Sequence, residues 1–68
     1  MNATNKVTPG DVGKRVTFQY ILPNGMSKEA VGMLEFWDAP AATYMVRQKD
    51  GGLLRIPARD VKHGKLVG

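Results

Sequence analysis

Apolar and polar residues alternate along the segment from residue 15 to residue 22, which lies between two turn sequences. Val16, Phe18, Tyr20 and Leu22 fall on one face of an extended chain, and the polar residues between them fall on the other. This period of two, built from β-branched and aromatic side chains, predicts a half-buried β-strand. The sequence Pro-Asn-Gly at 23–25 ends the strand, because proline interrupts strand pairing and Asn-Gly favours a tight hairpin.

Three further segments continue the strand pattern. Residues 29–37 are rich in apolar side chains and contain Gly32, and an interior glycine indicates a bulge or a sharp bend. Residues 38–42 break the pattern, residues 43–48 resume it, and the turn at 49–52 returns the chain into a strand at 53–56.

The two ends of the chain are less regular. Pro57–Asp60 is too short for an α-helix, and a proline at its start suits a single 3₁₀ turn. Residues 61–67 form a fifth, weaker strand that Gly64 interrupts. Residues 1–8 are polar and without pattern, so we expect a disordered lead before a folded domain at 9–68.

Five short strands favour a closed arrangement. An open sheet would leave two unprotected edges, and a sandwich needs about seven strands. A small barrel encloses one core, and a 3₁₀ turn before the last strand is typical of SH3-like barrels. We therefore predict an all-β fold, a small five-stranded SH3-like barrel. Its predicted core is Val16, Phe18, Val31, Met33, Leu34, Tyr44, Val46, Leu54, Ile56 and Val61.

Composition limits what such a domain does. A chain of 68 residues makes one domain with a thin core. It has no cysteine, which excludes disulfides and thiolate metal sites and agrees with a reducing compartment, so we expect a cytoplasmic protein. No apolar stretch approaches the roughly 18 residues of a membrane span. We expect no cofactor and no membrane association.

Charge is distributed unevenly along the chain. Residues 1–46 carry four bases and four acids, whereas residues 47–68 carry six bases and two acids, so the whole net charge of +4 lies in the last third. Such an asymmetry marks either a surface for phosphates or acidic proteins, or simply the solvated face of two strands.

Two segments begin like known ligand-binding motifs but lack residues that those motifs require. The sequence at 10–15 has the wrong spacing for a phosphate-binding loop and lacks Ser or Thr after its lysine. The sequence at 48–53 begins like a coenzyme A pyrophosphate loop, but Leu53 replaces a small residue and no helix follows. Ser27 and His63 are the only serine and histidine, and a small barrel offers no cleft for a triad. We expect no enzyme.

Aromatic and basic residues are the candidates for binding. Exposed aromatic side chains bind extended peptides in SH3-type barrels. Beside basic side chains, they also stack on the nucleobases of single-stranded nucleic acid. Phe36 and Trp37 are adjacent and point to opposite faces, and the sequence leaves open which one is exposed. The candidate partner-binding residues are Phe36, Trp37, Tyr44, Arg47, Lys49, Arg55, Arg59 and Lys65.

Two of these bases are expected to be neighbours. Arg47 and Arg55 lie on either side of the turn at 49–52, and like charges opposite one another destabilise a hairpin unless something neutralises them. An anionic partner is one source of that neutralisation, and Asp50 and Asp60 are internal candidates.

Several short sequences, taken in order, carry a family resemblance. They are Gly13-Lys14-Arg15-Val16, Leu22-Pro23-Asn24-Gly25, the segment from Val31 to Trp37, Lys49-Asp50-Gly51-Gly52, and Arg55-Ile56-Pro57-Ala58-Arg59-Asp60-Val61 followed by Gly64-Lys65. In this order the chain resembles the SH3-like N-terminal domain of actinobacterial GNAT-family acetyltransferases. In that family the acetyl-CoA site belongs to the catalytic domain after the barrel, so the resemblance transfers no catalytic residue.

Together these features predict a non-catalytic SH3-like binding or accessory module. A protein is the expected partner. The alternative is a small basic barrel that binds RNA or DNA. The thin core is compatible with a monomer or a weak homodimer, and no heptad pattern argues for a stronger one.

Overall fold

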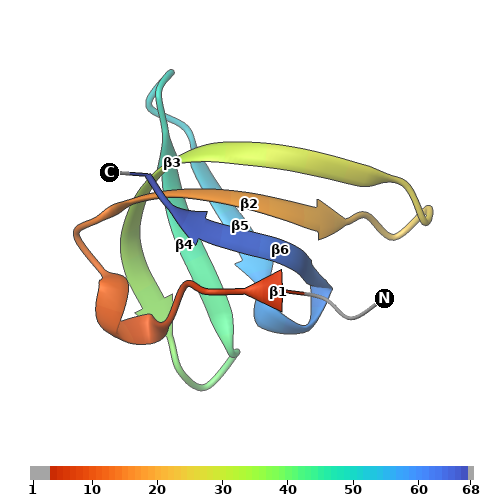
Figure 1. The fold of residues 1–68 in the computed structure, drawn as a ribbon, viewed down its shortest axis with the longest axis horizontal. Helices are drawn as coiled ribbons and strands as arrows, with labels where there is room; N and C mark the ends of the chain where they lie inside the picture. The colour runs from red at the N-terminus through yellow and green to blue at the C-terminus, as the bar shows by residue number, and fades with distance from the viewer. Residues whose placement is uncertain (1–3, 68) are drawn as a thin grey trace.

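The protein is a small all-β domain, seen here in a computed structural model that describes residues 4–67 (Figure 1). These residues contain no α-helix. The predictions for residues 1–3 and 68 lie outside the described part of the chain. The strands and 3₁₀ turns are β1 (Thr4–Asn5), η1 (Pro9–Asp11), β2 (Arg15–Ile21), β3 (Ser27–Asp38), β4 (Thr43–Gln48), β5 (Leu53–Pro57), η2 (Ala58–Asp60) and β6 (Val61–Leu66).

The strands form one curled sheet in the order β1-β6-β2-β3-β4-β5. The five longer strands are antiparallel, and η2 immediately precedes the last of them, which confirms the predicted all-β class and the 3₁₀ turn. β3 pairs with β2 through its first part and with β4 through its second, so it runs through both halves of the fold (Figure 1). Closure was expected to remove the sheet edges, but no ladder within residues 4–67 joins β5 to β1 or β6.

Gly32 allows β3 to pass close to β4. It is paired with Val16 on one side and Gln48 on the other. A Cβ atom at this position would overlap the backbone carbonyl oxygen of Arg47 and lie 3.0 Å from the Val46 side chain. The predicted special role of this glycine is therefore a close backbone approach. The register shift itself occurs two to four residues later, between Leu34 and Phe36, and makes Glu35 the extra residue of a bulge.

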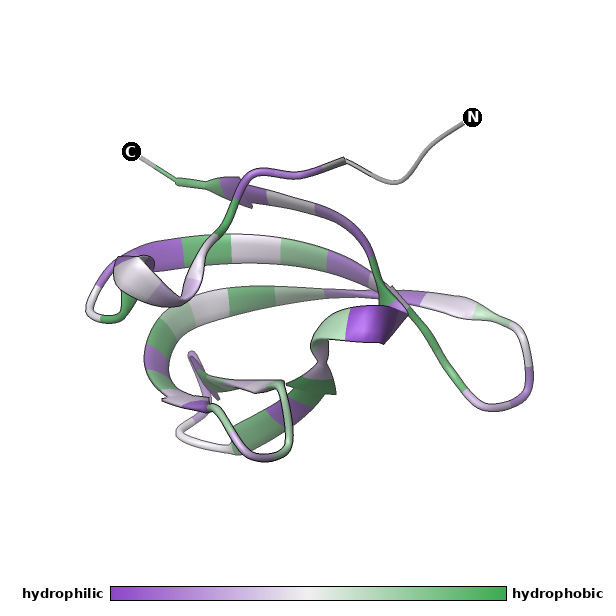
Figure 2. Cartoon of the chain, turned by 90° about the horizontal axis from the view of Figure 1, so that it is seen from below, coloured by the Kyte–Doolittle hydropathy of each residue, from purple (hydrophilic) through white to green (hydrophobic). Residues whose placement is uncertain are grey.

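The core lies inside the curled sheet. Hydrophobic and hydrophilic residues alternate along the strands, so that one face of each strand contributes to this core (Figure 2). Of the predicted core, Leu54 is partly buried against the cluster. The fully or nearly buried members of the prediction are Val16, Phe18, Leu34, Tyr44, Val46, Ile56 and Val61.

The prediction is wrong for Val31 and Met33, which are 50% and 45% exposed. The inward positions of β3 are instead Ala30, Gly32 and Leu34. Where β3 lies close to its neighbouring strands, the inward-facing positions hold small residues. The larger side chains between them therefore point outward. The sequence prediction followed side-chain size and chose the wrong face. It also left Val7, Tyr20 and Ala30 out of the core.

The disordered lead predicted for residues 1–8 is wrong for residues 4–8. β1 pairs in parallel with β6, and the Lys6 amide donates to the carbonyl oxygen of Gly64 at 2.9 Å. Val7 is 3% exposed and belongs to the core cluster, and its carbonyl accepts a hydrogen bond from the Tyr44 hydroxyl at 3.2 Å. The burial of Val7 and the backbone hydrogen bonds to the edge of β6 thus order residues 4–8, although their sequence has no strand pattern.

Asp11 ties this segment to the start of β2. Its Oδ2 accepts hydrogen bonds from the Thr8 amide at 2.8 Å and the Thr8 hydroxyl at 3.2 Å, while Lys14 Nζ lies 3.4 Å from Oδ1. The Thr8 amide, followed by the Lys14 and Thr8 side chains, holds the pKa of the Asp11 carboxyl below its ordinary value, against the opposing effect of burial.

We expect Asp11→Asn to flatten the acid dependence of stability. A lowered pKa means that the ionised Asp11 stabilises the fold above the ordinary value of 3.8, and that this contribution is lost as the pH falls through the lower folded value. Urea unfolding from about pH 6 down to about pH 2 would measure it. Asp60→Asn is the control, since Asp60 makes no side-chain hydrogen bond or ion pair found within residues 4–67. Parallel pH profiles for wild type and Asp11→Asn would contradict this role.

Candidate interaction surface

Phe36 is the exposed member of the aromatic pair. It is 58% exposed, whereas Trp37 is partly buried against the core with its ring centroid 4.8 Å from that of Tyr44. The bulge at Glu35 explains the choice, because the extra residue moves the inward phase from position 36 to position 37. The sequence left open which of the two aromatic side chains is exposed, and this one-residue register shift decides it.

Tyr44 belongs to the core. It is 4% exposed, its ring centroid lies 4.9 Å from that of Phe18, and its hydroxyl also accepts from Asn5 Nδ2 at 3.4 Å. The ring therefore has no open face for a partner, and we remove Tyr44 from the candidate contact residues.

Arg47 is neutralised within the protein by Glu35. Its Nε and Nη2 donate to the two Glu35 carboxylate oxygens at 3.0 and 2.8 Å, and its Nη1 donates to the carbonyl of Gly51 at 2.8 Å. The Arg47 hydrogen bonds lower the pKa of Glu35, and the same hydrogen bonds raise the pKa of Arg47. The acids expected for this role, Asp50 and Asp60, do not pair with Arg47.

Arg55 has a separate acidic neighbour, since its Nη2 lies 3.7 Å from Asp38 Oδ2. Arg47 is opposite Leu53 and Arg55 is opposite Met45, so the two arginines are diagonal neighbours on one face of the hairpin. They lie close together, as expected, but each already has a carboxylate. Unneutralised like charge is therefore no longer an argument for an anionic partner at this pair.

The other predicted bases are exposed but dispersed. Lys49 lies in the turn between β4 and β5, Arg59 lies in η2, and Lys65 lies on β6. They come from three different elements, so the structure does not assemble the predicted bases into one cluster.

Exposed apolar side chains gather on the outer face of β3, β4 and β5. Met33, Arg47 and Leu53 are opposite one another across the three strands, and Phe36, Met45 and Arg55 form the next row. Four of the apolar residues are between 45% and 58% exposed, and Met45 is covered between its neighbours. We call this set the outer patch; it consists of Val31, Met33, Phe36, Met45 and Leu53.

Sequence reasoning found only Phe36 of the outer patch. Val31 and Met33 were assigned to the core, and Leu53 was placed in the strand at 53–56 but not among the contact residues. The alternation of Ala30 and Gly32 with Val31 and Met33 was the available signal, since one of the two sets had to face outward.

Several hollows open on the surface of the protein. One of about 400 Å³ borders the outer patch and combines Val31 and Met33 with basic side chains; its lining is Arg15, Val31, Gly32, Met33, Arg47, Gln48 and Lys49. A smaller hollow of about 210 Å³ lies beside Ala42, Thr43 and Arg59.

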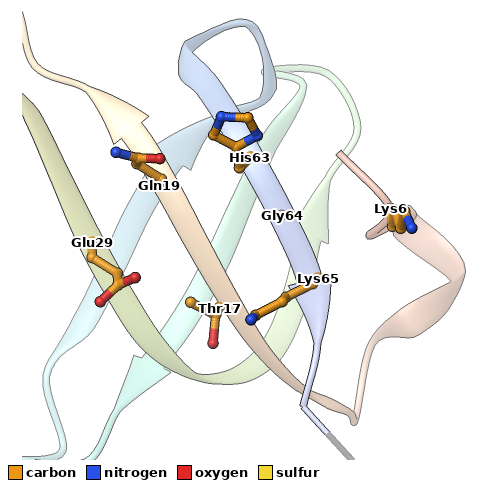
Figure 3. A pocket seen from close by; sticks show the side chains of 7 residues that line it. All are labelled: Lys6, Thr17, Gln19, Glu29, His63, Gly64 and Lys65. Carbon is orange, nitrogen blue, oxygen red and sulfur yellow. The ribbon is translucent and has the colours of Figure 1, made fainter. Parts of the chain in front are cut away.

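A third hollow, of about 330 Å³, lies over β6, β2 and β3 (Figure 3). Gln19 and His63 are paired on neighbouring strands, Lys65 extends toward Thr17, and Glu29 and Lys6 lie at its sides (Figure 3). His63 and Lys65 are exposed, and Glu29 offsets part of the positive charge. The hollow is open to solvent and offers no enclosed position for a reacting group.

The described residues offer little for other chemistry. Within residues 4–67 there is no group of three or more His, Cys, Asp or Glu side chains placed to hold a metal ion. That part of the chain also has no helix of the length and apolar character needed to cross a membrane.

The surface of residues 4–67 thus carries an apolar patch crossed by internally paired arginines, beside hollows that are open to solvent. Comparison of the chain with protein-family models, curated proteins and solved structures finds no match.

Proposed function

We propose that the chain is a non-catalytic protein-interaction module that contacts its partner through the outer patch. One observation carries the proposal: Val31, Met33 and Phe36 on β3 and Leu53 on β5 are each about half exposed on the outer face, on either side of Met45 and Arg47. Apolar surface gains roughly 25 cal/mol for each Å² removed from water, and large contiguous apolar patches mark contact sites.

The charges around the outer patch favour a polypeptide partner. The Arg47–Glu35 pair crosses its centre, and such paired polar groups beside an exposed aromatic are typical of protein contact surfaces, where aromatic residues and arginine are enriched. The partner then buries Phe36 and Met33 without having to leave an unpaired charge behind.

The alternative, a small basic barrel that binds RNA or DNA, has less support. A surface on which nucleobases stack requires exposed aromatic rings beside unpaired arginine or lysine side chains. Tyr44 lies in the core, however, and Trp37 packs against the core. Arg47 already donates to both carboxylate oxygens of Glu35. Phe36 is left as the one predicted aromatic with a largely open ring.

The finer assignment is also a proposal. The order β6-β2-β3-β4-β5, with a 3₁₀ turn before β6, supports an SH3-like barrel similar to the N-terminal module of actinobacterial GNAT-family acetyltransferases. In such a setting the module is an accessory contact element, without a cofactor of its own. We propose that it acts in the cytoplasm, as a monomer or a weak homodimer.

The test compares a patch variant with a matched control. The double variant Met33→Ser, Phe36→Ser removes two outer-patch side chains, and Met26→Ser removes an apolar side chain that is 65% exposed in the turn between β2 and β3. Immobilised proteins are incubated with source lysate, and captured proteins are quantified by mass spectrometry. We expect the double variant to lose at least about tenfold in capture of the wild-type partner, which corresponds to about 1.4 kcal/mol, and Met26→Ser to retain it.

Equal capture by wild type and the double variant would overturn the proposal, as would equal losses in both variants. Capture that disappears after nuclease treatment would favour the nucleic-acid alternative. Concentration-dependent dimers that only the double variant abolishes would make the outer patch a self-association surface instead. Titration with mixed single-stranded DNA and RNA, followed by Trp37 fluorescence, is expected to show no binding that weakens steeply with salt.

A further inference from the structure

β5 is an edge strand with an unpaired side. Within residues 4–67 it pairs with β4 and with no other strand. Its length, Leu53–Pro57, leaves room for a short added strand, and the outer patch reaches it through Leu53. An unpaired edge of this kind is a template for an extended peptide, because main-chain hydrogen bonds supply affinity there.

The turn at 48–52 determines which backbone groups of β5 face the free side. The Gln48 amide donates to the Gly52 carbonyl at 2.8 Å, and Gly51, with φ of 91°, completes the turn. Hydrogen-bonded pairs alternate along an antiparallel ladder, so the next such pairs are Val46–Leu54 and Tyr44–Ile56. The N–H and C=O groups of Leu53 and Arg55 therefore point away from β4.

The other side of β4 leads to the same assignment. Leu34 uses its amide and carbonyl for Lys14 and Gly13, at 2.9 and 2.7 Å, on the β2 side of β3. The preceding residue, Met33, consequently bonds toward its partner Arg47 on β4. The backbone N–H and C=O groups of Arg47 therefore point toward β3, and those of Val46 point toward β5.

The side chains along this edge specify the occupant. Lys49, Arg55 and Arg59 are exposed bases on or beside β5, whereas Arg47 is bonded to Glu35 and is not available to a partner. The Arg55 side chain is 61% exposed and its Asp38 contact is long at 3.7 Å, so it has room for a second carboxylate. A second copy paired through β5 about Arg55 would place like charges together, which disfavours self-pairing.

We infer that the partner binds as an added β-strand on the free edge of β5 and presents a carboxylate to Arg55 and an apolar side chain to Leu53. This inference rests on the proposed function and names the chemistry of its partner. Leu53 and Arg55 are two residues apart and share the outer face. An antiparallel segment therefore reads acid-x-apolar along its own sequence. Pro57 has no amide to donate and limits the pairing at the end of β5.

The first experiment selects ligands from a random peptide library displayed on phage, with the wild-type chain as bait. We expect enriched peptides to carry Asp or Glu two residues before an apolar residue. Enriched peptides without an acidic residue would overturn the inference. No enrichment, together with lysate capture that still depends on the outer patch, would overturn the inference and leave the proposed function standing. Absence of both would overturn both.

The second experiment locates a selected peptide on the edge by amide hydrogen exchange. In the free protein we expect the Leu53 and Arg55 amides to exchange faster than those of Leu54 and Ile56, which bond to β4. Saturating peptide should slow Leu53 and Arg55 selectively. Binding that leaves these two amides unprotected would exclude strand addition, and this measurement needs no substitution.

Variants at Arg55 separate its side chain from its backbone. Arg55→Ala removes the charge and is expected to weaken peptide binding about tenfold. Arg55→Pro removes the free amide as well and is expected to weaken it further, while the β4 ladder keeps its own hydrogen bonds. Arg59→Ala, in η2 and outside β5, is the matched charge control and should change binding less than threefold, roughly. Equal losses for Arg55→Ala and Arg59→Ala would contradict a specific contact with Arg55.

Discussion

Replacing Phe18 by alanine is expected to lower the free energy of unfolding by about 3–5 kcal/mol. The side chain is fully buried, and its ring lies against Tyr44 with centroids 4.9 Å apart. β6 closes over the same ring, since a Cβ atom on Gly64 would come within 2.9 Å of it. Domains of this length have a total stability of roughly 3–10 kcal/mol, so the variant should be largely unfolded or close to it.

Phe36→Ala is the matched control for this prediction. It removes the same side chain from a position that is 58% exposed, so we expect a stability change within about 0.5 kcal/mol. Urea unfolding followed by Trp37 fluorescence measures both variants, because Trp37 packs against the core beside Tyr44. Losses of similar size in the two variants would contradict the assignment of Phe18 to the core and Phe36 to the surface.

The strands and hairpin turns could be predicted because their determinants are local. β2 follows the alternation of Val16, Phe18 and Tyr20, and the turn after β4 follows Asp50 and Gly51. The 3₁₀ turn after Pro57 was likewise available from the fixed backbone angle of proline. None of these features depends on contacts with distant parts of the chain.

The face of β3 could not be predicted in the same way. Its inward phase depends on how closely β2 and β4 approach, and the bulge at Glu35 then reverses that phase before Trp37. Hydrophobicity alone favoured Val31 and Met33 for the core. The tertiary approach of the neighbouring strands overrides that preference.

The candidate site was predicted in part for a related reason. Arg47 was identified as a candidate contact residue, but its partner Glu35 is twelve residues away on β3 and meets it only through the β3–β4 register. Without that register, the sequence offered Asp50, three residues from Arg47, and Asp60, five residues from Arg55. The anchoring of Val7 by Tyr44 spans an even longer separation and leaves no local pattern.

The outer patch and the core have a common structural origin in β3. Because Ala30 and Gly32 are small, β3 lies close to its neighbours, and the larger Val31 and Met33 are displaced to the outer face. The outer patch is therefore a consequence of how the fold closes around Leu34 and Val46. A change at Gly32 should affect stability and partner binding together.

Gly32→Ala is expected to lower the free energy of unfolding by about 3 kcal/mol, at the upper end for overpacked sites. The added Cβ would overlap the Arg47 carbonyl oxygen, and a backbone atom held in the β3–β4 ladder cannot rotate away as a flexible side chain can. Relief requires β4 to shift, which moves Arg47 and the outer patch with it. Gly10→Ala is the control, because its nearest neighbour is the Thr8 hydroxyl at an ordinary 3.6 Å. We expect urea unfolding to separate the two variants clearly, and patch-dependent capture to fall only for Gly32→Ala. Equal stability of the two variants would show that β3 and β4 are not in this close contact.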